Sequence, residues 1–97
     1  MPTYVVLSNF TDQGIRNIKE SPKRAEAFRE LAKHHGCTVR ELLWTHGQYD
    51  TVAIIEAQDE ISANALGLSV AKLGNIRSQS LRGYSAEEMK KILDRVT

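Results

Sequence analysis

The sequence predicts an α+β fold of the ferredoxin-like class, a βαββαβ sandwich in which helices cover one face of a four-stranded antiparallel sheet. Two observations predict it: segments typical of strands and helices alternate in the order β-α-β-β-α-β, and neither a repeat nor a linker interrupts that order. A length of 97 residues fits one such domain. A further helical segment follows the last strand. We therefore expect a domain at residues 1–84 and a C-terminal helical tail at residues 85–97.

The first half of the chain predicts a strand followed by helix. Residues 4–7 (YVVL) form a β-branched run typical of a strand. Thr11 or Asp12 can cap a short helical turn. Ser21 and Pro22 then begin the main helix, because a serine hydroxyl accepts hydrogen bonds from free backbone N–H groups and proline suits the first turn. The expected inward face of this helix is Ala25, Phe28, Leu31, Ala32 and His35. Gly36 is expected to end it in a left-handed conformation.

The second half predicts a hairpin, a helix, a strand and the tail. Strands are expected at residues 37–46, 49–57 and 75–84. Asp59 is expected to cap the second helix, which Gly74 ends. The expected inward residues of that helix are Ile61, Ala65, Leu68 and Leu73. Residues 85–88 (SAEE) match a capping box that opens the tail helix. The apolar stripe of the tail is Met89, Ile92, Leu93 and Val96.

Two strands are apolar on both faces, which has a consequence for assembly. A sheet with one wet face alternates apolar and polar residues, but residues 4–7 and 52–55 do not. Something must therefore cover the second face. The tail helix is one candidate, but it is short. We favour a second copy of the chain, that is, a homodimer or higher homo-oligomer formed through the open sheet face.

The hairpin segment WTHGQYDTVAII contains the candidate site, namely Trp44, His46, Gly47, Tyr49 and Asp50. If Gly47 and Gln48 form a two-residue type II′ turn, His46 faces Tyr49 on one face of the sheet. The same count pairs Arg40 with Ile55, and it places Asp50 on the opposite face.

These hairpin residues have a catalytic and a structural interpretation. His46 beside Tyr49 could act as a general base or ligand in a cavity. The structural alternative is a polar cross-strand pair at the hairpin tip, with Asp50 accepting backbone hydrogen bonds that fix the turn. Trp44 is more typical of a core or an interface than of a cofactor platform. We favour the structural interpretation.

Several classes of partner are not expected. Thirteen basic and twelve acidic residues are interspersed and give a net charge of +1, which argues against nucleic acid. No apolar run is long enough for a membrane span, and residues 1–10 do not resemble a signal peptide, so a cytoplasmic location is expected. We expect no metal and no cofactor, because adjacent His34 and His35 point about 100° apart on a helix. Whether His34, His35, His46 or Cys37 binds a metal or haem is left open, although Cys37 fits a buried strand position.

Residues 2–84 as a whole resemble the GYD domain family. Gly47, Tyr49 and Asp50 match its signature, and the likeness extends over residues 2–84, including TYVVLSNFTDQGIRNIKESPKRAEAF, IIEA and LGNIRSQSL. The resemblance implies a small ferredoxin-like domain that pairs as a dimeric α+β barrel. It transfers no catalytic residue, since none is established for the family.

Two functions follow as hypotheses. The first is a small oligomeric domain that binds a small-molecule ligand or assembles with itself. The alternative is a small-molecule enzyme of the dimeric α+β barrel type, monooxygenase- or isomerase-like, that uses the hairpin of His46 and Tyr49. The sequence leaves open whether the protein is an enzyme.

Overall fold

The computed structural model describes residues 1–97 and confirms the predicted fold class. The elements are β1 (Thr3–Phe10), α1 (Asp12–Arg16), the 3-10 helix η1 (Ile18–Glu20), α2 (Ser21–His34), β2 (Cys37–Trp44), β3 (Thr51–Ala57), α3 (Glu60–Ala71), β4 (Ile76–Gly83) and α4 (Ala86–Leu93). The strands form one antiparallel sheet in the order β2-β3-β1-β4. This is the ferredoxin-like arrangement.

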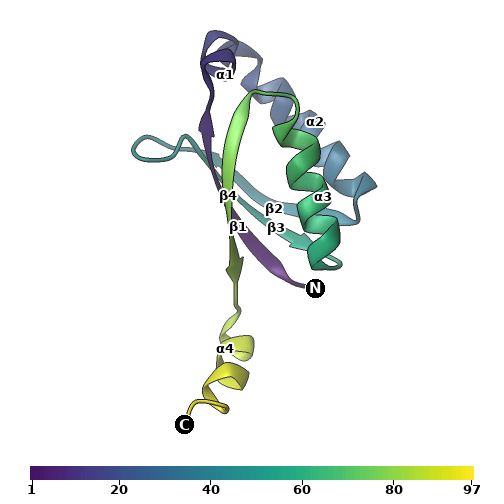
Figure 1. Cartoon of the computed structure of the whole chain (residues 1–97), viewed down its shortest axis with the longest axis vertical. Helices are drawn as coiled ribbons and strands as arrows, with labels where there is room; N and C mark the ends of the chain where they lie inside the picture. Colours follow the sequence, from purple (N-terminus) through teal and green to yellow (C-terminus); the bar gives the residue numbers. More distant parts are fainter.

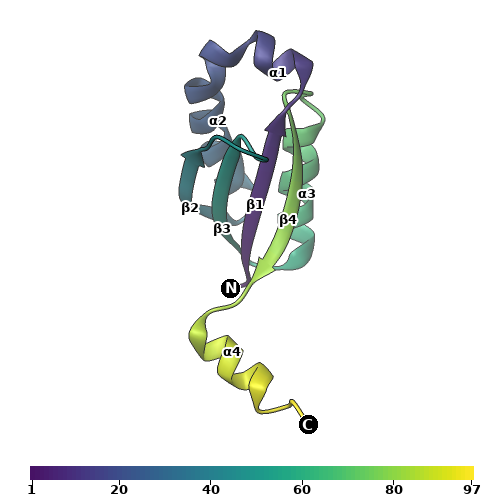
Figure 2. The same ribbon diagram turned by 90° about the vertical axis from the view of Figure 1, so that its left-hand side faces the viewer.

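Helices cover only one face of the sheet. In Figure 1, α2 and α3 lie to the right of β1 and β4. Figure 2, which views the molecule from the left of Figure 1, shows the strands with no helix in front of them. The tail helix α4 extends beyond the end of β4 and away from the sheet. The tail therefore does not cover the open face.

Most of the predicted helix ends are confirmed. The Thr11 hydroxyl accepts from the Gly14 N–H at 3.1 Å, and the Asp59 carboxylate accepts from the Ser62 N–H at 2.7 Å. Gly36 follows α2 with a φ of 69°, the left-handed region that glycine tolerates best. The predicted serine cap of α2 is wrong. The Ser21 hydroxyl instead accepts a hydrogen bond from Trp44 Nε1 at 2.9 Å, because tertiary packing turns it toward β2.

The predicted inward face of α3 is also wrong in part. Ile61, Leu68 and Leu73 are 82%, 71% and 59% exposed, respectively, whereas Leu66 is buried. The residues of α3 that pack against the core are Ala63, Leu66 and Val70. Apolar residues occupy both faces of this helix, so periodicity alone does not decide which face packs inward.

The hydrophobic core between helices and sheet is small. Its buried apolar residues are Ala32, Cys37, Ala53, Ile55, Ala57 and Leu66. Leu66 is the only large side chain among them with less than 2% exposure. Phe28, Leu31 and Val6 pack around this core but are only partly buried. The two layers therefore leave space between them.

The hairpin is longer and less regular than predicted. β2 ends at Trp44 and β3 begins at Thr51, so residues 45–50 form the connection and the predicted two-residue turn is wrong. The pairing of Trp44 with Thr51 holds, but a bulge between Val39 and Glu41 pairs Ile55 with Val39 rather than with Arg40. A bulge inserts one unpaired residue, which shifts the register beyond it.

A capping box and an arginine fix the start of the tail helix. The Ser85 hydroxyl accepts from the Glu88 N–H, and the Glu88 carboxylate accepts from the Ser85 N–H, both at 3.1 Å. Arg82 of β4 donates to the same carboxylate at 3.0 Å, and its guanidinium lies 4.6 Å from the ring centre of Tyr84. The capping box predicted from the sequence is thus confirmed.

No helix of the chain is both long enough and apolar enough to cross a membrane.

Candidate functional site

The β2–β3 connection is held by hydrogen bonds from Thr45 at its base. The Thr45 N–H donates to the Asp50 carbonyl at 2.8 Å, and the Thr45 hydroxyl donates to the Tyr49 carbonyl at 2.6 Å. Gly47 has a φ of 138°, and a side chain added there would meet no atom within 4 Å. His46, Gly47 and Gln48 are exposed. The tip of the loop therefore projects into open space.

Asp50 fastens this loop to the central strand β1. Its carboxylate accepts a hydrogen bond from the Phe10 N–H at 2.9 Å, and its own N–H donates to the Ser8 carbonyl at 2.8 Å. The acceptor role predicted for Asp50 is thus present. The donor, however, belongs to β1 rather than to the turn itself. Asp50 positions the loop against the end of the sheet.

Tyr49 reaches across the sheet to the edge strand β4. Its hydroxyl contacts the side-chain oxygen of Gln79 at 3.0 Å. Gln79 is the register partner of Leu7, and Leu7 is in turn the partner of Val52. Since paired residues share one face, the Tyr49 ring lies at the end of the face that no helix covers.

That open face is lined by apolar side chains from all four strands. The registers place them together as Val5, Leu7, Leu43, Val52, Ile54 and Leu81. Leu43 and Leu81 are 55% and 43% exposed, respectively, and the others are partly buried. The sequence prediction of a second apolar face is therefore confirmed.

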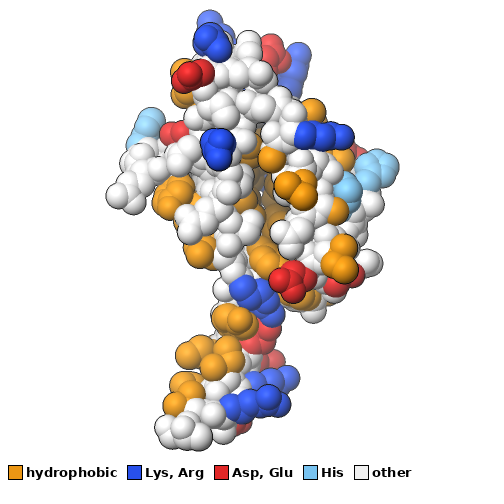
Figure 3. Space-filling view, viewed as in Figure 1, with side chains coloured by type: hydrophobic (Ala, Val, Ile, Leu, Met, Phe, Trp, Pro, Cys, Tyr) orange, Lys and Arg blue, Asp and Glu red, His pale blue; other side chains and the backbone are white.

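The opposite face forms the floor of a cavity of about 210 Å³ beneath α2 and α3. Figure 3 shows a hollow between β4 and α3 with hydrophobic side chains at its bottom. Trp44 lines the cavity from the end of β2, together with Ala53 and Ile55 of β3. The cavity is thus open to solvent on the β4 side.

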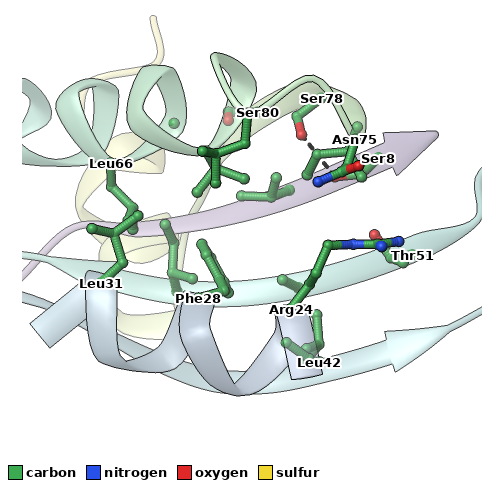
Figure 4. A pocket seen from close by; sticks show the side chains of 18 of the residues that line it. Ser8, Arg24, Phe28, Leu31, Leu42, Thr51, Leu66, Asn75, Ser78 and Ser80 are labelled. Atoms are coloured by element: carbon green, nitrogen blue, oxygen red, sulfur yellow. Dashed lines mark hydrogen bonds between the residues drawn. The ribbon is translucent and has the colours of Figure 1, made fainter. Parts of the chain in front are cut away.

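Most of the labelled polar residues gather toward one end of this cavity in Figure 4, although Leu42 lies beside Arg24 there and Ser80 lies apart from the others. Phe28, Leu31 and Leu66 lie at one end. The polar end contains Ser8, Arg24, Thr51, Asn75 and Ser78. The Ser8 and Ser78 hydroxyls are 2.8 Å apart and hydrogen-bonded to each other. An amphipathic lining of this kind is typical of a ligand pocket.

The structure separates the residues predicted for one site. Trp44 lines the cavity, whereas His46, Gly47, Tyr49 and Asp50 do not. His46 and Tyr49 lie beyond the ends of the paired strands, so no cross-strand register brings them together.

The polar residues of the cavity were missed in the sequence. Ser8, Ser78 and Ser80 occupy inward strand positions, and a polar residue at an inward position is the signal that could have identified them. Arg24 gave no comparable signal, because it reads as part of the charged face of α2.

Cys37, His34 and His35 are not part of any cluster of three or more side chains that could hold a metal ion. No such group of histidine, cysteine or acidic side chains occurs elsewhere in the chain either. Cys37 is 3% exposed, and burial raises the pKa of its thiol, to which the nearby negative charge of Asp59 adds. A buried thiol with a raised pKa is a poor nucleophile.

Comparisons with known proteins agree with this fold. The model of the GYD domain family matches residues 4–93, a span that includes α4. A Thermus thermophilus protein named glutamine synthetase and cystathionine beta-lyase binding protein is 30% identical over 90 residues, which cover 92% of this chain and 95% of that one.

Solved structures show the same fold at lower identity. The crystal structure of FFRP-DM1 superposes with a TM-score of 0.63 at 14% identity, covering 87% of this chain and all of that one. The crystal structure of TTHA0845 from Thermus thermophilus gives a TM-score of 0.58 at 22% identity, covering 89% and 96%, respectively.

Proposed function

The chain belongs to the GYD domain family, and from this starting point we propose that it is a non-catalytic binding and assembly domain. In this proposal two copies pair through their open sheet faces, in the manner of a dimeric α+β barrel, and the pair binds other proteins. The observation that carries the proposal is the apolar sheet face that neither a helix nor the tail covers. Large exposed apolar patches on small proteins mark interaction surfaces.

The position of the tail helix supports the same surface. The hydrophobic side chains of α4 gather on its left side in Figure 3, and the open sheet face also points to the left in Figure 1. Met89, Ile92 and Leu93 are 44%, 38% and 54% exposed, respectively. A copy seated on the sheet would approach the tail from the side of this stripe. We therefore assign the tail to an extension of the same contact.

The hairpin serves the pairing surface rather than a reaction in this proposal. Asp50 is engaged by the backbone of β1, and Tyr49 by Gln79 at the end of the open face. His46 is exposed at the loop tip and does not line the cavity beneath α2 and α3. An enzyme built on these residues would need them in an enclosed pocket. The arrangement therefore favours binding over catalysis.

The related Thermus protein supplies the first partners to test. It is named for binding glutamine synthetase and cystathionine β-lyase, and it matches this chain over almost its whole length. We propose that this chain likewise binds an enzyme as its partner. Co-migration of the purified chain with each of the two enzymes in sedimentation velocity tests this. Independent sedimentation of both enzymes at micromolar concentrations would contradict the choice of partners.

A charged substitution on the sheet face tests the pairing. Burial of a whole leucine contributes about 1.5–3 kcal/mol, and Leu81 is 43% exposed. Burying that remainder contributes about 0.6–1.3 kcal/mol, and twofold symmetry counts it twice. Leu81→Glu also places an unpaired carboxylate in an apolar contact. We expect it to weaken dimerisation by about 100-fold or more in sedimentation equilibrium.

Ile61→Glu is the matched control. Ile61 is 82% exposed on α3, in the helical layer, and receives the same chemical change. The proposal predicts that Ile61→Glu pairs as the unchanged chain does. If Ile61→Glu dissociates the dimer and Leu81→Glu does not, the helical layer is the interface and the proposal is wrong.

A further inference from the structure

The cavity beneath α2 and α3 offers a site that the pairing surface does not use. It lies on the helix-covered face of the sheet, opposite the face proposed for pairing. Small side chains leave its volume of about 210 Å³, namely Ala25 on α2, Ala63 and Gly67 on α3, and Ser78 and Ser80 on β4. A cavity of about 150 Å³ with an apolar lining suffices to bind benzene. The volume therefore suits a small organic molecule.

The charge at the polar end of the cavity determines the sign of the charge on the molecule that it can bind. Arg24 lines the cavity and is half-buried, and Figure 4 shows its guanidinium extending toward Thr51 at the polar end. It donates to the Asn17 carbonyl at 2.9 Å and to the Gly14 carbonyl at 3.4 Å, both uncharged groups. No carboxylate lies within 4.0 Å of it. An arginine stays protonated, so its charge is available to an anion.

Hydroxyl groups at the same end supply further donors. Ser8 and Ser78 share one hydrogen bond of 2.8 Å, in which one hydroxyl donates and the other accepts. The accepting hydroxyl keeps its own proton, and the hydroxyl of Thr51 lies at the same end of the cavity. A carboxylate oxygen accepts from both guanidinium and hydroxyl donors.

We propose that this cavity binds a small apolar monocarboxylate. The carboxylate lies at the polar end beside Arg24 and the serine pair. The hydrocarbon part lies against Phe28, Leu31 and Leu66, which form the apolar end. The proposal is independent of the pairing proposed above, because the two surfaces lie on opposite faces of the sheet.

Octanoate is the probe, and Trp44 reports its binding. Trp44 is the only tryptophan and lines the cavity, so a bound ligand changes its fluorescence. We expect saturable binding of octanoate to the full-length chain, about tenfold or more tighter than that of octan-1-ol, which has the same chain without the charge. The absence of a saturable change with octanoate would overturn the proposal.

Substitutions separate the two ends of the site. Arg24→Met is expected to weaken octanoate by about tenfold or more and to leave octan-1-ol unchanged. Arg29→Met is the control, because Arg29 lies on the same helix, donates to the Val39 carbonyl and does not line the cavity. Equal octanoate affinity in Arg24→Met and Arg29→Met would refute the role of Arg24.

A second variant blocks the cavity without removing a contact. A side chain at Gly67 would meet no atom within 4 Å, and replacing a mid-helix glycine favours the helix, so Gly67→Leu should fold. It is expected to weaken octanoate and octan-1-ol alike. Leu81→Glu should leave octanoate binding unchanged. If Leu81→Glu abolishes octanoate binding while Gly67→Leu preserves it, octanoate binds the open sheet face and the proposal is wrong.

Discussion

Asp50→Ala tests how the hairpin is attached to the sheet. The substitution removes the carboxylate that accepts the Phe10 N–H at 2.9 Å, while the backbone bond from Asp50 to Ser8 can persist. A hydrogen bond to a charged group contributes about 1.5–3 kcal/mol, and the partial exposure of Asp50 lowers this to about 1–2 kcal/mol. For a domain of this size the melting temperature should fall by about 5–15 °C.

The assay is urea unfolding at one fixed protein concentration, because pairing adds to the apparent stability. Asp50→Asn is the control, since its side-chain oxygen still accepts from Phe10, and it should lose less than half as much stability. If the free energy of unfolding of Asp50→Ala stays within about 0.5 kcal/mol of the unchanged chain, as for an ordinary surface position, Asp50 does not anchor the hairpin.

Three further predictions concern Tyr49, Cys37 and Glu88. Tyr49→Phe should change the free energy of unfolding by less than about 0.5 kcal/mol, because the hydrogen bond from Tyr49 to Gln79 is exposed. The same substitution should weaken dimerisation in sedimentation equilibrium. A large loss of stability with unchanged pairing would contradict this prediction. Cys37 should react with a disulfide reagent far more slowly in the folded chain than in urea, because burial protects it and raises the pKa of its thiol; equal rates would refute it. The Ser85 N–H lowers the pKa of Glu88 below 4.5, so its capping contribution is complete above that pH and is lost as pH falls through the lowered value. Amide NMR shifts of α4 should report this loss, and Glu88→Gln should abolish the pH dependence.

Local signals in the sequence predicted most of the fold because they act over a few residues. Thr11, Asp59 and the Ser85 capping box end or begin helices through contacts with their own neighbours. Gly36 likewise ends α2 through its own left-handed backbone conformation. Apolar residues at consecutive strand positions correctly indicated an apolar second face, because side chains of a strand alternate between faces.

Features that depend on tertiary contacts were not predictable in this way. The inward face of α3 was assigned wrongly because apolar residues surround that helix, and only packing on the sheet selects Leu66 over Leu68. Ser21 turns from a helix cap to the Trp44 side chain for the same reason.

The register of the hairpin and the position of the cavity also depend on tertiary contacts that local sequence signals do not report. The unpaired position at Arg40 shifts the register without any proline or glycine to announce it. The cavity is the space left by small side chains on α2, α3 and β4, so no single segment encodes it. Candidate residues such as Arg24 become visible only when the helices are placed over the sheet.

Two copies of the chain are proposed to pair through the open sheet face. The mass of the unmodified protein in solution tests this most directly, measured by light scattering coupled to size-exclusion chromatography at micromolar concentration. A dimer has twice the chain mass of 10.9 kDa, and that is the expected result. The mass of a single chain at micromolar concentration would contradict pairing through the sheet face.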